Sequence, residues 1–91
     1  MVTAIVVNPA DNVATALQDL HQDDVVTDSG GRSIHVRGDI PYGHKVALLR
    51  IERGSEVIKY GEVIGRATRT IEPGEHTHVH NLESLRGRGD L

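Results

Sequence analysis

The sequence contains no cysteine, no phenylalanine and no tryptophan, and only two of its 91 residues are tyrosine. Without cysteine, disulfide bonds and thiol chemistry are excluded, which fits a reducing compartment. With so few aromatic side chains, the core must be aliphatic, and a module that stacks nucleic-acid bases on aromatic rings is not expected. The formal net charge of −3 also argues against a nucleic-acid partner, because phosphate binders usually present a basic face.

Long hydrophobic runs are absent as well. No stretch approaches the roughly 20 apolar residues that span a bilayer, and the first residues, MVTAIVVNPADN, lack the basic segment of a secretory signal. We therefore expect a cytoplasmic protein without a membrane segment. Its length is enough for one small domain with a modest core.

The first third of the sequence predicts one helix between short strands. A β-branched run at 3–7 ends at an Asn-Pro pair and indicates a strand. Asp11 is then a good N-cap for a helix over roughly residues 12–21. Apolar residues recur there at helical spacing: Val13, Ala16, Leu17 and Leu20. A Gly-rich turn separates strands expected at 25–27 and 33–36, which together indicate a hairpin.

Four Ile-x-x-Gly sequences punctuate the rest of the chain: IPYG at 40–43, IERG at 51–54, IKYG at 58–61 and IEPG at 71–74. Each glycine can adopt the positive φ of a turn, and each isoleucine can anchor that turn in the core. The apolar stretches between them are too short for helices and predict a strongly bent structure of many short strands. We place the domain at 1–85 and expect the Gly-rich tail, 86–91, to lie outside it.

Three histidines, His76, His78 and His80, occupy alternate positions in the stretch GEHTHVHN. On a strand they share one face, with Thr77 and Val79 on the other. Neighbouring members lie about 6 to 7 Å apart at Cα, so two imidazoles can bind one metal ion, but the outer pair is about 13 Å apart and a third ligand requires a bend. Without thiolates, such a site suits Fe(II) or Mn(II), with Zn(II) also possible. The alternative is that these histidines are polar residues of a half-exposed strand.

Longer motifs make a family resemblance visible. The chain contains G-H-K-V-A-L at 43–48, Y-G-x-x-I-G-x-A at 60–67 and G-E-H-x-H-x-H-N at 74–81, after an early NPADNVATAL. Together they closely resemble the small SAF-type (β-clip) domain of the altronate and galactarate dehydratase family, and the small subunit of sulfolactate sulfo-lyase shares the pattern. The resemblance covers most of residues 4–85. We therefore expect a mainly β, compact, SAF-like β-clip with one short N-terminal α-helix.

The resemblance also implies a reaction, the β-elimination of water from a sugar acid to give a 2-keto-3-deoxy acid. Such a lyase needs a base for the proton α to the carboxylate, a Lewis acid for the enediolate and an acid for the departing hydroxyl. In this family the domain accompanies a large catalytic part, so we expect activity only with a large catalytic subunit. The alternatives are a sulfolactate sulfo-lyase subunit, which would eliminate sulfite, and a non-catalytic carbohydrate- or metal-binding module.

The same motifs supply the candidate site residues. His44 is expected to act as an acid/base or a metal ligand, Lys45 to attract the substrate carboxylate and Tyr60 to bond substrate hydroxyls. Each has a plainer alternative: His44 caps a turn, Lys45 is solvated, and Tyr60 adds aromatic bulk to the core. The three alternating histidines are the candidate ligands of a divalent metal, with Glu75 and Asn81 as neighbours that orient their rings.

Overall fold

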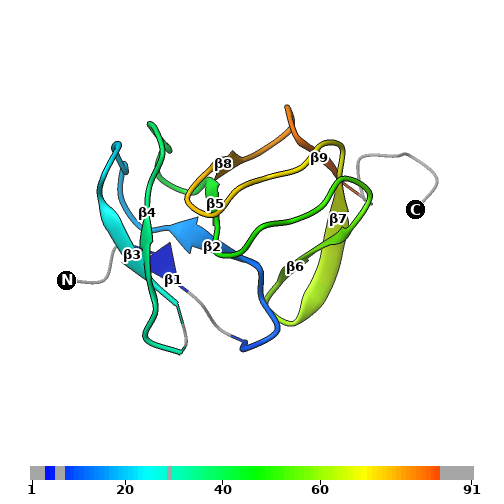
Figure 1. Cartoon of the computed structure of the whole chain (residues 1–91), viewed down its shortest axis with the longest axis horizontal. Coiled ribbons are helices and arrows are strands. Elements are labelled where there is room, and N and C mark those ends of the chain that lie inside the picture. The colour runs from blue at the N-terminus through cyan, green and yellow to red at the C-terminus, as the bar shows by residue number, and fades with distance from the viewer. Residues whose placement is uncertain (1–3, 6–7, 29, 85–91) are drawn as a thin grey trace.

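The computed structural model describes residues 4–5, 8–28 and 30–84, which form nine short strands (Figure 1). The strands are β1 (Ala4–Ile5), β2 (Val13–Ala16), β3 (Val25–Thr27), β4 (Ser33–His35), β5 (Lys45–Ala47), β6 (Glu56–Lys59), β7 (Glu62–Ala67), β8 (His76–Thr77) and β9 (Leu82–Ser84). The expected tail at 86–91 lies outside the described residues. Among the described residues, no helix is long and apolar enough to cross a membrane.

The strands form three antiparallel sheets. A four-stranded sheet in the order β1-β2-β5-β8 occupies the middle of the molecule. The β3-β4 hairpin lies at one end of the long axis, and the three-stranded sheet β6-β7-β9 lies at the other, as Figure 1 shows. The predicted hairpin is confirmed, and so is the mainly β architecture.

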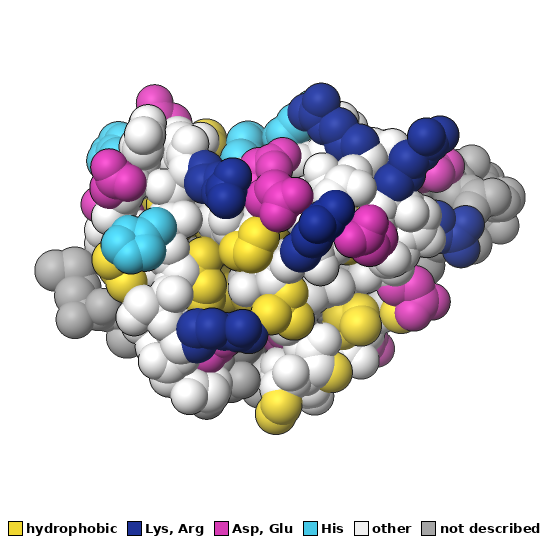
Figure 2. Space-filling view, viewed as in Figure 1, with side chains coloured by type: hydrophobic (Ala, Val, Ile, Leu, Met, Phe, Trp, Pro, Cys, Tyr) yellow, Lys and Arg dark blue, Asp and Glu magenta, His cyan; other side chains and the backbone are white. Residues whose placement is uncertain are grey.

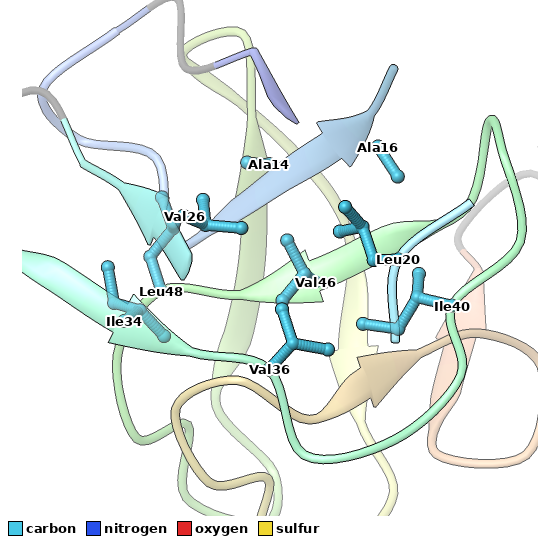
Figure 3. Close-up of a cluster of buried hydrophobic side chains, with 9 residues drawn as sticks. All are labelled: Ala14, Ala16, Leu20, Val26, Ile34, Val36, Ile40, Val46 and Leu48. Carbon is cyan, nitrogen blue, oxygen red and sulfur yellow. The ribbon is translucent and has the colours of Figure 1, made fainter. Parts of the chain in front are cut away.

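Two aliphatic clusters form the core, one on each face of the central sheet. The first lies between this sheet and the β3-β4 hairpin (Figure 3), and its members are Ala14, Ala16, Leu20, Val26, Ile34, Val36, Ile40, Val46 and Leu48. The second lies towards the three-stranded sheet, and its members are Val13, Ala47, Ile51, Val57, Ala67, Ile71 and Leu82. Because side chains alternate along a strand, β2 contributes Val13 to one cluster and Ala14 and Ala16 to the other. A strand buried on both faces has a continuous apolar sequence.

The helix expected over residues 12–21 is wrong, because this segment contains β2 and no helix. Of the four apolar positions that matched a helical period, Val13 and Ala16 lie in β2, Leu20 is buried after it and Leu17 is exposed. Asp11, which suggested a cap, and its neighbour Asn12 have long-range partners. The Asp11 carboxylate accepts a hydrogen bond from the N–H of Gly61 at 2.8 Å, and the Asn12 side-chain oxygen accepts one from the N–H of Ile58 at 2.7 Å. These contacts attach β2 to the β6-β7 hairpin.

Three of the Ile-x-x-Gly sequences form one recurring turn. Their isoleucines are buried, and Gly43, Gly54 and Gly74 have φ values of 86°, 87° and 86°. Each of these glycines donates its N–H to the carbonyl of a strand residue. A further copy of the turn runs from Leu20 to Asp23, with Asp23 at φ 73°. The sequence pattern missed it because leucine and aspartate stand in place of isoleucine and glycine. The IKYG copy differs, because its last two residues form the tight turn of the β6-β7 hairpin.

Candidate active site

The pairing of β5 with β8 brings His44 to the histidine-rich stretch. Lys45 lies opposite Thr77, and Val46 lies opposite His76 in this antiparallel pair. His44 immediately precedes β5 and follows the turn that ends at Gly43, so the same register places it beside the residue that follows β8. That residue is His78, and its ring stacks on the His44 ring with centroids 4.0 Å apart and an interplanar angle of 19°.

A hydrogen bond and further ring contacts join the histidines into one cluster. Nδ1 of His44 lies 2.9 Å from Nε2 of His76, so one nitrogen donates a proton and the other accepts it. The centroids of His76 and His78 are 5.6 Å apart, with nearly parallel rings. His80 is exposed and contacts only the outer side of the cluster, with its centroid 5.1 Å from that of His76.

The chain bends directly after β8, and Asn81 holds this bend. Strand β8 ends at Thr77, and the chain then turns through residues 78–81. Asn81 is fully buried, its side-chain oxygen accepts the N–H of His78 at 2.9 Å, and its amide donates to the carbonyl of His76 at 2.8 Å. The alternation expected for residues 75–81 therefore holds only within the short β8.

Three of these histidines lie close enough together that they could hold a metal ion. Among the described residues, one ring nitrogen from each of His44, His76 and His78 lies within 4.8 Å of the other two. Ligand bonds of about 2.1 Å place adjacent nitrogens about 3.0 to 3.4 Å apart, so the rings would have to rotate out of their stacked arrangement to meet one ion. The group contains His44, whereas the sequence reasoning had expected His80 as the third ligand.

The electrostatics of the cluster favour neutral imidazoles. Burial lowers the pKa of His76, and the neighbouring His80, His44 and His78 lower it further. The pKa of His78 is lowered by burial and then by His44 and Lys45. A neutral imidazole offers a free lone pair, which both a metal ligand and a general base need.

A cleft of about 550 Å³ opens beside the cluster. Lys45, Tyr60 and His78 all line it, so three of the sequence-derived candidates share one cavity. Burial lowers the pKa of Lys45, and the charge of Lys59 lowers it further. Tyr60 is 46% exposed, which argues against the alternative that it fills the core. Its hydroxyl lies 3.4 Å from that of Thr15.

Sequence reasoning missed two charged residues of this cleft, Lys59 and Glu62. They flank Tyr60-Gly61 and lie opposite each other in the β6-β7 hairpin. Lys59 also places its ammonium nitrogen 5.1 Å from the centroid of the Tyr60 ring. Both residues lie close to the candidate Tyr60 in the sequence, and this proximity could have indicated that they share its site.

A second depression, of about 640 Å³, shares no lining residue with the histidine cleft. It is lined by residues of the β3-β4 hairpin and of the segment 48–50, including Arg32, Arg37 and Arg50. Two of these arginines already form ion pairs, Arg32 with Asp28 and Arg50 with Glu52. On the face shown in Figure 2, basic and acidic side chains are interspersed, so this face has no continuous basic patch. The sequence-derived candidates Lys45, Tyr60 and His78 line the histidine cleft and not this depression.

The mainly β fold agrees with the family comparison. Residues 2–85 match the family model of the altronate/galactarate dehydratase SAF domain. The chain belongs to this family.

Three relatives indicate the enzymes in which such a domain occurs. The chain is 40% identical over 84 residues to altronate dehydratase of Bacillus subtilis (strain 168), and 43% identical over 80 residues to that of Escherichia coli (strain K12). These matches cover 92% and 88% of the chain but only 17% and 16% of the relatives. The (2R)-sulfolactate sulfo-lyase subunit alpha of Paracoccus pantotrophus is 42% identical over 62 residues, which are 68% of this chain and 92% of that subunit.

Proposed function

We propose that this chain is the SAF domain or small subunit of an altronate-type sugar-acid dehydratase, and that its histidine cluster completes an active site shared with a large catalytic part. The observation that carries the proposal is the convergence of His44, His76 and His78 beside a cleft that contains Lys45 and Tyr60. The similarity to two altronate dehydratases, each about six times as long as the aligned region, supports the need for a larger companion.

In this proposal the three imidazoles hold a divalent cation, Fe(II) or Mn(II) by preference and Zn(II) as a third option. Such an ion would supply Lewis-acid stabilisation of negative charge on the substrate. The chain's own residues do the positioning. Lys45 attracts the substrate carboxylate, Tyr60 bonds a substrate hydroxyl, and Asn81 fixes the orientation of the cluster through the backbone of His76 and His78.

The alternative role for His44 is general acid/base catalysis. In that case His44 and His76 share one proton across their 2.9 Å contact, and turnover does not depend on added metal. A metal titration of the chelator-treated enzyme separates the two roles. Restoration of turnover by Mn(II) or Fe(II) supports ligation, and turnover unaffected by chelation supports acid/base chemistry.

The proposal is tested by reconstitution with the large catalytic subunit and an assay for 2-keto-3-deoxy acid formed from altronate. We expect no turnover by the chain alone, turnover by the complex, and its loss in a His44→Ala, His78→Ala double variant. His21→Ala is the matched control, because His21 lies outside the cluster and contacts Asp39. Full activity of the double variant in the complex would remove the proposal.

A second candidate is the alpha subunit of a sulfolactate sulfo-lyase, because the alignment with that protein covers 92% of its length. This function would also require a large catalytic partner, but the product would be sulfite. Assaying one reconstituted complex on sulfolactate and on altronate decides between the two functions. Metal or carbohydrate binding by the chain, without turnover in either complex, would instead indicate the non-catalytic module.

A further inference from the structure

Both lysines of the chain line the same cleft. The sequence has ten lysines and arginines, and only Lys45 and Lys59 are lysines. They come from different sheets, since Lys45 begins β5 of the central sheet and Lys59 ends β6 of the three-stranded sheet. The cleft of about 550 Å³ between these strands is within the range of small-molecule sites.

Neither lysine has an ion-pair partner among the described residues, although each is only partly exposed. One carboxylate, that of Glu62, also lines the cleft, and it lies across the hairpin from Lys59 without pairing with it. Two unpaired ammonium groups in a partly enclosed space create a positive potential that favours an anion. A lysine ammonium group is a compact charge with three hydrogen-bond donors. Two lysines on opposite sides of a carboxylate can therefore each bind one of its oxygens.

Tyr60, which also lines the cleft, has an unfavourable backbone conformation. Tyr60 has φ 56° and Gly61 has φ 77°, and together they form the two-residue turn between Lys59 and Glu62. Asparagine and glycine suit the first position of such a turn, whereas an aromatic residue there is strained. Strained residues concentrate at functional sites, where the side chain is needed in one place. Here the Tyr60 hydroxyl lies 3.4 Å from that of Thr15 in β2 of the central sheet.

We propose that Lys45 and Lys59 together bind the carboxylate of a hydroxy acid in this cleft, that Tyr60 bonds one of its hydroxyls, and that His78 marks the end at which its α-carbon lies. Lys59 is thereby a specificity-determining residue. The apolar members of the lining, Val63, Ile64, Val79 and Leu82, provide the walls. The identification of the hydroxy acid as a sugar acid rests on the proposed function, but the preference for a carboxylate does not.

The test uses the full chain, because every residue that lines the cleft belongs to it. The backbone amide signals of the ¹⁵N-labelled protein are followed by NMR during titration with gluconate. Sorbitol, which lacks the carboxylate, and sodium chloride at equal ionic strength serve as controls. We expect saturable shifts at residues 45, 59, 60 and 78 with gluconate only. Absence of saturable binding, or equal shifts with sorbitol or chloride, would overturn the inference.

Variants assign the contacts. Lys45→Gln and Lys59→Gln should each weaken gluconate binding about tenfold, the effect of one charge-assisted contact. Arg37→Gln removes a charge from the other depression and should leave the affinity unchanged. The dispersion of the amide signals reports whether each variant is folded. If Lys45→Gln is unfolded, the gluconate affinity of Lys59→Gln alone tests the inference. Equal losses of gluconate affinity in Arg37→Gln and Lys59→Gln would show that only the net charge of the protein matters, and would overturn the inference.

The reconstituted enzyme separates this inference from the proposed function. Lys59→Gln should raise KM about tenfold with kcat changed less than about threefold, because a binding contact is lost. If the complex shows no turnover while the lysines still bind gluconate, the proposed function fails and the carboxylate site stands. If the Lys45→Gln, Lys59→Gln double variant turns over altronate with normal KM, the carboxylate site fails and the proposed function stands.

Discussion

Nδ1 of His44 lies 2.9 Å from Nε2 of His76, although the two residues are 32 positions apart in the sequence. The contact exists because β5 and β8 pair in one register, which sets His44 against the end of β8. A shift of one residue in this pairing would send the His76 and His78 side chains to the opposite face. The cluster is therefore a product of the fold and not of the histidine-rich stretch alone.

We expect a metal ion to distinguish His78 from His80. His78→Gln removes one of the three converging nitrogens and should weaken Zn(II) binding to the chain by at least about tenfold, as measured by calorimetry. His80→Gln is the matched control, because His80 is exposed and stands outside the group, and it should change the affinity by less than about threefold. Equal losses in both variants would contradict the assignment of the ligands.

The pH dependence of stability should report the neutral imidazoles. The pKa values of His76 and His78 are lowered from 6.5, by burial first and by neighbouring charges second. At pH below about 6.5 the unfolded chain therefore binds more protons than the folded chain. The stabilisation is fully present above pH 6.5 and is lost as the pH falls through the folded pKa values.

Urea unfolding of the chelator-treated protein between pH 5 and pH 8 measures the slope of the unfolding free energy against pH. A His76→Gln, His78→Gln double variant should flatten it in the region below pH 6.5. In an NMR titration, His76 and His78 should titrate below that value. His21 should titrate above it, because the hydrogen bond to Asp39 raises its pKa. A histidine titration order opposite to this would contradict the prediction.

Asn81 should prove important for stability as well as for the site. Asn81→Ala removes the partners of the His78 N–H and the His76 carbonyl and leaves a small buried space. Leaving two such groups unsatisfied costs about 2 to 4 kcal/mol in the free energy of unfolding. The exposed Glu83→Ala is the control and should change stability by less than about 0.5 kcal/mol. Equal effects would show that the Asn81 side chain does not hold the bend.

The sequence was informative where one local rule determined the structure. The buried isoleucines and the positive φ values of Gly43, Gly54 and Gly74 followed from a repeated four-residue pattern. The helix expected at 12–21 failed because burial on both faces of β2 depends on two other sheets, which a local period does not encode. The cluster could be predicted only in part, because the strand pairing that brings in His44 and the Asn81 bend are tertiary features. Lys59 was missed for the same reason.

Two glycines of the recurring turn should differ in their tolerance of a side chain. Gly54 and Gly74 have nearly the same φ, so alanine at either position costs about 1 to 2 kcal/mol in backbone strain. At Gly54 a new Cβ meets nothing within 4 Å, whereas at Gly74 it would clash with the carbonyl oxygen of His35. Gly74→Ala should therefore cost at least about 1 to 3 kcal/mol more than Gly54→Ala. Equal losses in urea denaturation would show that the β4 segment yields to the new side chain.

Tyr60 should show a conflict between stability and binding. Tyr60→Asn places a residue suited to φ 56° in the two-residue turn and should raise the free energy of unfolding by about 0.5 to 1 kcal/mol. The same change removes the phenol from the cleft and the ring beneath the Lys59 ammonium, so gluconate binding should weaken. Tyr60→Phe is the matched control, since it keeps the backbone strain and the ring and loses only the hydroxyl. It should bind gluconate more weakly than the parent without gaining stability. A Tyr60→Asn variant that is less stable than the parent would contradict this prediction. It would mean that the contacts of the tyrosine ring stabilise the fold by more than the backbone strain costs.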